Sequence, residues 1–298
     1  MKALVTGASG FLGKKVCSVF EEKGIGVIRS SGNKRSGFFE ADIRDKRAVV
    51  ELVRNTFPDV IVHTAANIDN DFCEQNRQEA FAVNVDGTKN LCHAAKLLGA
   101  KMVFISTEYV FDGEKNAPYT EEDPCSPVNY YGELKAMAEQ EVKTMLKNYL
   151  ILRPGILYGF NDQQPANNFI LSALNKMRGG EKVSGFAEQF TCPVLIDDVA
   201  NAIFKLLRQN KSGVYHLGGP DFVSRLDFLL AAAGVFGFDE NLVEKPSWEN
   251  SKRVAKKPKK GIQLSIEKAK KAEITLHGVQ SGLQIMRSQF PKEWFGVQ

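Results

Sequence analysis

Short apolar segments alternate with amphipathic ones along the first half of the chain. The apolar runs have the length of strands and lie at residues 3–6, 26–29, 58–63, 101–106 and 149–153. The segments between them carry helical spacings of apolar residues, at 11–23, at about 45–55, at 80–98 and at 130–146. Uninterrupted apolar strands are typical of parallel sheets that helices cover on both faces. We therefore predict an α/β fold with a doubly wound parallel sheet of the Rossmann type.

The alternation weakens after residue 160. Helices are expected at 167–177, 196–207, 224–236, 265–271 and 278–289, a last strand at 213–217, and loops at 186–193 and 245–260. Asp197 and Asp198 are expected to cap the helix that they begin. We predict a Rossmann domain of residues 1–160 plus about 196–217. About 161–195 and 218–298 would form a smaller α/β substrate-binding domain.

The overall composition narrows the functional classes. A formal charge of +4 is small for 298 residues and predicts neither a nucleic acid nor a membrane as a partner. The five cysteines are widely spaced and form no metal-ligand motif with the four histidines, so no metal site is expected. The chain starts with a strand rather than a signal peptide, which predicts a reduced, cytoplasmic location. A homodimer is compatible with the sequence.

The turn after the first strand carries three glycines with the spacing G-x-x-G-x-x-G, at Gly7, Gly10 and Gly13. Such a turn brings a backbone close to a pyrophosphate, and the helix that follows directs free N–H groups at it. We assign Ser9, Phe11 and Leu12 to the same cofactor site. The alternative is a glycine-rich turn that binds nothing.

The residues after the second strand bear on the choice of cofactor. An acidic residue there would hold a ribose 2′-hydroxyl, but the stretch from Arg29 to Arg35 contains no carboxylate. A guanidinium favours a 2′-phosphate, so we predict NADP(H) rather than NAD(H), with Arg29 in contact. The alternative is a solvated basic loop.

Candidate catalytic residues lie at and before the start of the helix at 130–146. Tyr131 and Lys135 are four residues apart and share one face of that helix. A nearby ammonium brings the phenol pKa toward the working range, so Tyr131 is the predicted proton donor. Thr107 follows a strand and can donate a hydrogen bond to a substrate carbonyl. The alternative is a surface Tyr–Lys pair without a catalytic role.

These motifs resemble the extended short-chain dehydrogenase/reductase superfamily. The most similar group is that of dTDP-4-dehydrorhamnose reductases, which includes the regulatory β subunit of methionine adenosyltransferase. The matching segments are GASGFLG (7–13), VIVHTAA (60–66), VNVDGTKNL (83–91), STEYVFDG (106–113), PVNYYGELKAMAE (127–139), LRPGILYG (152–159) and DDVA (197–200).

The resemblance implies roles for individual residues. Thr107, Tyr131 and Lys135 would be the catalytic triad, with Tyr131 and Lys135 also at the cofactor. The remaining implied cofactor contacts are Asp42 and Ile43 at the adenine, Ala65, Ala66 and Asn67 along the cofactor, and Pro154 near the nicotinamide.

The sequence also departs from the group's pattern. Glu108 stands where these reductases usually have an aspartate, and no tryptophan follows Arg153 closely. The leading hypothesis is an NADPH-dependent reductase of a nucleotide-linked 4-keto-6-deoxysugar. Its diphosphate would meet Arg253, Lys256 and Lys257, and the alternative for these three residues is a solvated loop. The alternatives are a cofactor-binding regulatory subunit and an epimerase or dehydratase. Cys192 is the lone candidate for an epimerase's proton-abstracting residue.

Overall fold

The computed structural model describes residues 1–160, 168–246, 254–258 and 260–295. Within these residues, seven strands form one parallel sheet in the order β11-β6-β5-β4-β1-β2-β3. The strands are β1 (Lys2–Thr6), β2 (Gly26–Ser31), β3 (Phe39–Glu40), β4 (Val60–His63), β5 (Lys101–Ile105), β6 (Tyr149–Pro154) and β11 (Gly213–Leu217). The predicted doubly wound α/β fold is confirmed.

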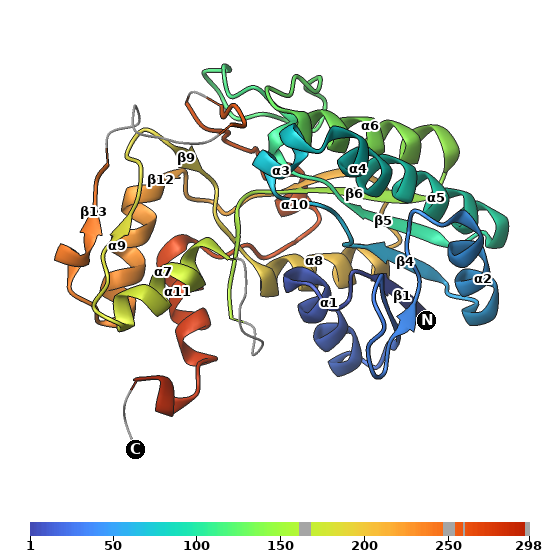
Figure 1. The fold of residues 1–298 in the computed structure, drawn as a ribbon, viewed down its shortest axis with the longest axis horizontal. Coiled ribbons are helices and arrows are strands. Elements are labelled where there is room, and N and C mark those ends of the chain that lie inside the picture. Colours follow the sequence, from blue (N-terminus) through green and yellow to red (C-terminus); the bar gives the residue numbers. More distant parts are fainter. Residues whose placement is uncertain (161–167, 247–253, 259, 296–298) are drawn as a thin grey trace.

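Helices cover both faces of this sheet (Figure 1). The helices α1 (Phe11–Glu22) and α8 (Ile196–Arg208) pack on one face, and α2 (Lys46–Thr56), α5 (Gly87–Leu98) and α6 (Tyr130–Met145) on the other. The α2 helix starts where the sequence predicts, because the Asp45 side chain accepts hydrogen bonds from the N–H groups of Arg47 and Ala48. The sheet order reverses between β1 and β4, and open α/β sheets bind ligands at such a point.

The segment expected as one helix at 80–98 has a more complex form. It consists of α4 (Arg77–Phe81), a π-helical turn (Ala82–Asp86) and α5, and it follows the short helix α3 (Asn70–Gln75). A π-helical turn within a longer helix is frequently found at a functional site. The polar residue Asn84 lies in this turn and is 1% exposed.

The second half of the chain builds a separate apolar core. The helices α7 (Phe169–Arg178), α9 (Arg225–Phe236) and α11 (Val279–Ser288) enclose it, at the left of Figure 1. Short strand pairs border it: β7 (Leu157–Tyr158) with β10 (Val194–Leu195), β9 (Phe190–Thr191) with β12 (Val223–Ser224), and β8 (Val183–Ser184) with β13 (Val243–Glu244). The domain boundaries given above stay a prediction.

Two details of this half differ from the sequence-based expectation. The stretch 186–193, expected as a loop, contains β9. Asp197 and Asp198 do not cap α8, whose N-cap residue is Leu195. Instead, Asp197 accepts a hydrogen bond from Lys15 Nζ of α1 at 2.9 Å, and Asp198 accepts one from the backbone N–H of His277 at 2.7 Å. Both carboxylates therefore tie α8 to other parts of the chain.

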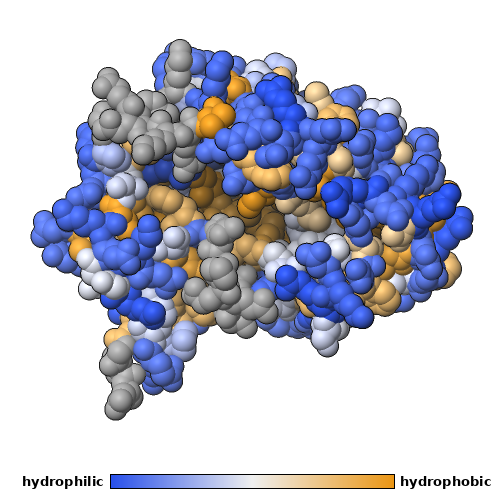
Figure 2. Space-filling view, viewed as in Figure 1, coloured by the Kyte–Doolittle hydropathy of each residue, from blue (hydrophilic) through white to orange (hydrophobic). Residues whose placement is uncertain are grey.

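A recess lies between the two halves. Figure 2 shows apolar residues on its walls, between the part with the large sheet and the part with α7, α9 and α11.

The short helix α10 (Glu267–Lys271) packs near β11.

Candidate active site

The glycine turn connects β1 to α1 at the carboxyl end of the sheet. Gly7 has φ +66°, and a Cβ there would lie 2.6 Å from the backbone nitrogen of Ala65. A Cβ on Gly13 would lie 2.2 Å from the carbonyl oxygen of Gly7. These two glycines are therefore required by the close packing of the turn, whatever it binds.

Gly10 has a different environment. It is exposed, and a Cβ there would meet only the Gly7 carbonyl oxygen, at 3.1 Å. Gly10 is also the N-cap residue of α1, and no side chain caps the helix. The first N–H groups of α1, at Phe11 and Leu12, thus lie at an uncapped helix start, while Ser9 is half-buried in the turn. An uncapped helix N-terminus behind a glycine turn fits a pyrophosphate.

The segment after β4 forms the neighbouring wall of this site. Ala65, Ala66 and Asn67 are half-buried there. Asn67 is held by Asn84, whose side-chain oxygen accepts from the Asn67 N–H at 2.8 Å and whose amide donates to the Asn67 carbonyl at 2.9 Å. We did not predict this role of Asn84 from the sequence. The available signal was a polar residue in the middle of the segment predicted as a helix at 80–98.

The residues expected at the adenine end have partners of their own. Arg29 lies within β2 and donates to Glu21 Oε2 at 2.6 Å. Asp42 pairs with Arg44 at 2.6 Å, and the hydrogen bond from Arg44 lowers the pKa of its carboxyl. Ile43 is 8% exposed and packs under the start of α5, close to Gly87. Contact of Arg29 with a 2′-phosphate stays a prediction.

Thr107 and Tyr131 come together at the end of β5. Thr107 lies two residues past the end of this strand, and its Oγ1 accepts from the N–H of Tyr109 at 3.2 Å. Tyr131 lies in the first turn of α6, which Asn129 caps by accepting from the Gly132 N–H at 2.9 Å. Burial raises the pKa of Tyr131 well above its usual range, and a hydrogen bond with Thr107 acts against this rise. The phenol is therefore held in its protonated form.

Lys135 is buried one turn further along α6. Its Nζ donates to the carbonyl oxygen of Ile105 at 2.5 Å and lies 4.1 Å from the ring centroid of Phe104. Burial lowers the pKa of Lys135 to about 7, while the charge of Glu139 acts in the opposite direction. The expected effect of Lys135 on the Tyr131 pKa stays a prediction, because Lys135 binds the strand end here. Pro154, the last residue of β6, is also buried.

Glu108 faces the second half of the molecule. It is 4% exposed, and both of its carboxyl oxygens lie within 3.3 Å of the Thr191 hydroxyl. Burial raises the pKa of Glu108 to about 8, although Thr191 and the charge of Arg225 act to lower it. The carboxyl is thus protonated at neutral pH. It borders a cavity of about 20 Å³ lined by Glu108, Tyr109, Ile156, Gln189, Phe190, Thr191, Arg225, Pro258, Gly261 and Ile262.

Residues 254–258, the described centre of the lysine-rich segment expected as a loop, contact both halves of the molecule. The N–H groups of Val254 and Ala255 donate to Asp71 Oδ1 of α3, and the carbonyl of Lys256 accepts from Asn129. Lys257 Nζ lies 3.4 Å from Gln189 Oε1. Of the three residues predicted to bind the diphosphate, Lys256 therefore lies at the start of α6 and Lys257 beside the cavity. Arg253 lies outside the described residues.

Three further observations concern metal ligands, the Cys192 thiol and membrane-spanning helices. Within the described residues, no group of three or more His, Cys, Asp or Glu side chains is arranged to hold a metal ion. Cys192 is buried, and burial raises the pKa of its thiol to about 12. Of the helices in the described ranges, none combines the length and apolar character that crossing a membrane requires.

Comparison with known proteins identifies the family of this chain. Residues 1–290 match the RmlD substrate binding domain family. The chain belongs to that family. The reductase Agl14 of Haloferax volcanii, named as probable in low-salt glycan biosynthesis, is a relative with 31% identity over 87% of this chain and 88% of its own. The family resemblance predicted from the motifs is confirmed.

Two other similar proteins bear on function. The β subunit of methionine adenosyltransferase 2 from Rattus norvegicus is 32% identical over 79% of this chain and 72% of its own. The crystal structure of dTDP-4-dehydrorhamnose reductase from Bacillus anthracis in complex with NADP is 28% identical, with a TM-score of 0.87, and covers 97% of this chain and 99% of that one. The chain is thus similar both to a reductase with a bound nicotinamide cofactor and to a subunit of another enzyme.

Proposed function

We propose that the protein is an NADPH-dependent reductase of a nucleotide-linked 4-keto-6-deoxysugar. The comparisons confirm the broader class, an NAD(P)-dependent oxidoreductase of the dTDP-4-dehydrorhamnose reductase type. The observation that carries the finer proposal is the placement of Thr107 beside Tyr131 at the end of β5, where Thr107 acts to lower the Tyr131 pKa, with Lys135 buried one turn further along α6.

The arrangement fits proton donation to a carbonyl oxygen. Bound NADPH would supply a hydride to the keto carbon. Tyr131 would donate its phenolic proton to the oxygen, which requires the protonated phenol that burial maintains. Thr107 would hold the same oxygen by a hydrogen bond, and Lys135 would stabilise the phenolate that remains. Burial of Tyr131 and Lys135 limits the access of water to this proton transfer.

The cofactor would lie along the carboxyl ends of β1 and β4. The α1 N-terminus at Gly10, Phe11 and Leu12 would hold the pyrophosphate, and Lys135 would contact the nicotinamide ribose. The open space above Gly10 supports this position, because a Cβ there meets only the Gly7 carbonyl.

The sugar would lie in the recess outside the cavity beside Glu108, since the cavity itself has room for about one water. The protonated Glu108 carboxyl, the Thr191 hydroxyl and the Gln189 amide offer hydrogen bonds suited to sugar hydroxyls. Arg225 and Lys257 contribute positive charge at the same place, which suits the diphosphate of a nucleotide-sugar.

One observation favours a second candidate, a regulatory subunit. The relative from Rattus norvegicus is named as a subunit of methionine adenosyltransferase and matches as well as the reductases do. An epimerase has less support, because the buried Cys192 thiol donates to the Ile262 carbonyl and its raised pKa keeps it protonated.

Tyr131→Phe tests the reductase proposal. The change removes one oxygen and keeps the ring, so NADPH binding and folding should be retained. Positioned proton transfer typically contributes about 10²–10⁴ in rate, and we expect turnover to fall by that factor with little change in KM. Stopped-flow NADPH oxidation, across a panel of dTDP-, UDP- and GDP-linked 4-keto sugars, measures it.

The matched control is Tyr130→Phe at the neighbouring position. Tyr130 is half-buried and its hydroxyl contacts the Arg77 carbonyl at 3.4 Å, so its loss should leave turnover close to wild type. A wild-type protein that binds NADPH and reduces no sugar in the panel would favour the regulatory candidate.

A further inference from the structure

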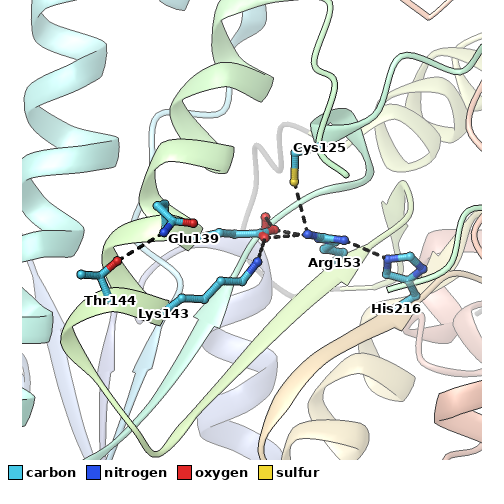
Figure 3. A network of polar contacts seen from close by, with 8 residues as sticks. Cys125, Glu139, Lys143, Thr144, Arg153 and His216 are labelled. Carbon is cyan, nitrogen blue, oxygen red and sulfur yellow. Dashed lines mark hydrogen bonds and ion pairs between the residues drawn. The ribbon is translucent and has the colours of Figure 1, made fainter. Parts of the chain in front are cut away.

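A buried ion pair lies between α6 and the large sheet (Figure 3). It joins Glu139 of α6 to Arg153 of β6, and both side chains are 1% exposed. Arg153 donates from Nε to Glu139 Oε1 at 2.8 Å and from Nη2 to Oε2 at 2.7 Å. Replacement of such pairs by apolar residues is often neutral or stabilising, so stability alone does not explain the pair.

The other polar contacts of Arg153 are also satisfied. Burial lowers the pKa of His216 to about 3, so its imidazole is neutral. Nε2 therefore accepts from Arg153 Nη1 at 3.4 Å, and the protonated Nδ1 donates to the Tyr119 carbonyl at 3.1 Å. Arg153 Nη2 also lies 3.3 Å from Cys125 Sγ. The guanidinium is thus held in one orientation toward Glu139.

Glu139 connects this pair to two predicted catalytic residues. It lies one helical turn after Lys135 on the same face of α6. Its Oε1 accepts from the hydroxyl of Ser106 at 2.6 Å, and Ser106 directly precedes Thr107. The same carboxylate therefore lies beside the lysine and holds the backbone that carries the threonine.

The charges around Lys135 give this arrangement an electrostatic role. Burial opposes the ammonium form, and the negative charge of Glu139 favours it. The imidazole of His63 on β4 also faces Lys135, but burial lowers its pKa to about 3 and leaves it neutral. Burial would likewise raise the pKa of Glu139, but Arg153, Ser106 and Lys143 hold it below its usual range.

We propose that Glu139 and Arg153 form a positioning pair for the reaction. Glu139 keeps Lys135 as an ammonium ion and fixes the backbone before Thr107, and Arg153 keeps Glu139 ionised and in place. The proposal rests on the proposed function only for the reaction that Lys135 serves. The charge relation of the three side chains is a property of the protein by itself.

The test is a titration of Lys135 in the protein without substrate. Lysines labelled with ¹³C at Cε are followed by NMR against pH, and Lys135→Met identifies the Lys135 resonance. An opposite charge nearby typically shifts a pKa by about 1–3 units. We therefore expect Glu139→Gln to lower the Lys135 midpoint by about one unit or more.

The matched control is Glu141→Gln on the same helix. It removes the same charge from a half-buried residue whose partner is Lys89 at 3.6 Å, and it should leave the Lys135 midpoint unchanged. A midpoint that moves equally in both variants would overturn the proposal, since any helix charge would then act alike.

A second variant covers loss of folding in Glu139→Gln, which leaves Arg153 buried without its counterion. Glu139→Met combined with Arg153→Met removes both charges and keeps the volume filled. We expect the Lys135 midpoint to fall here too, and the pH at which NADPH binding weakens to fall with it. A folded double variant with the wild-type midpoint would show that the pair serves packing alone. Neither readout needs a sugar, so failure of the proposed reductase activity would be seen separately.

Discussion

Glu108 is a buried carboxylic acid next to Thr107 in the chain. Its buried carboxyl accepts a hydrogen bond from the Thr191 hydroxyl, and burial raises its pKa from 4.5 to about 8. The folded state therefore keeps a proton that the unfolded state releases near pH 4.5. The stability that this proton provides is complete below pH 4.5 and is lost as the pH rises toward 8.

Glu108→Gln should remove this pH dependence. The amide keeps the shape and never ionises, whereas the wild-type protein loses up to about 1.4 kcal/mol of its free energy of unfolding per pH unit between 5 and 8. Urea unfolding at pH 5, 6, 7 and 8 should show the variant gaining on the wild type as the pH rises. Glu122→Gln, at an exposed position, should follow the wild type. Parallel curves for Glu108→Gln and the wild type would contradict a protonated carboxyl.

The sequence predicted some of the site at this scale. Tyr131, Lys135 and Thr107 could be selected because their chemistry follows from residue type and helical spacing. Glu139 and Arg153 stood within quoted motifs, yet no role was assigned, since their pairing joins a helix to a strand and depends on the assembled sheet. The contact of Arg29 with Glu21 was missed because the side-chain direction along β2 is set by the pairing with β1.

At the scale of elements, the glycine turn separates two functions that the sequence motif combines. Gly13 is required by packing, because a Cβ there would lie 2.2 Å from the Gly7 carbonyl and 2.8 Å from Thr64 Oγ1. Gly10 is exposed at the start of α1. The two positions should therefore respond differently to an added side chain.

Gly13→Ala should lower the free energy of unfolding by about 1–3 kcal/mol, as overpacking of a tight contact does. Gly10→Val should leave stability close to wild type and weaken NADPH binding at least tenfold, or about 1.4 kcal/mol. Thermal unfolding and fluorescence titration with NADPH measure the two effects. Wild-type NADPH affinity in Gly10→Val would show that the turn binds no phosphate.

The elements themselves were largely predictable. Apolar runs located the strands, and Asp45 marked the start of α2. The π-helical turn and the capping of α8 were not, because both depend on contacts distant in sequence: Asn84 with Asn67, and Asp197 and Asp198 with Lys15 and His277. Local residue preferences cannot predict contacts between residues that are distant in sequence.

At the scale of the whole molecule, the large sheet is completed late in the sequence. Its edge strand β11 pairs with β6, yet the helix α7 and the short strands β7 to β10 come between them in the chain. A chain of residues 1–160 would therefore lack β11 and leave β6 as an edge strand, unpaired on the side that β11 occupies. We expect this fragment to form larger particles than the full chain at micromolar concentration, as light scattering would show. A monomeric, cooperatively unfolding fragment would contradict this.

The late pairing of β11 also has a consequence during synthesis on the ribosome. Translation proceeds at about 5–20 residues per second, so β6 emerges seconds before the strand that covers it. Over the same interval Arg153 lacks its hydrogen-bond partner His216, which lies on β11. The nascent chain thus presents an open sheet edge beside an incompletely enclosed guanidinium, and this interval is when the protein would depend most on a chaperone.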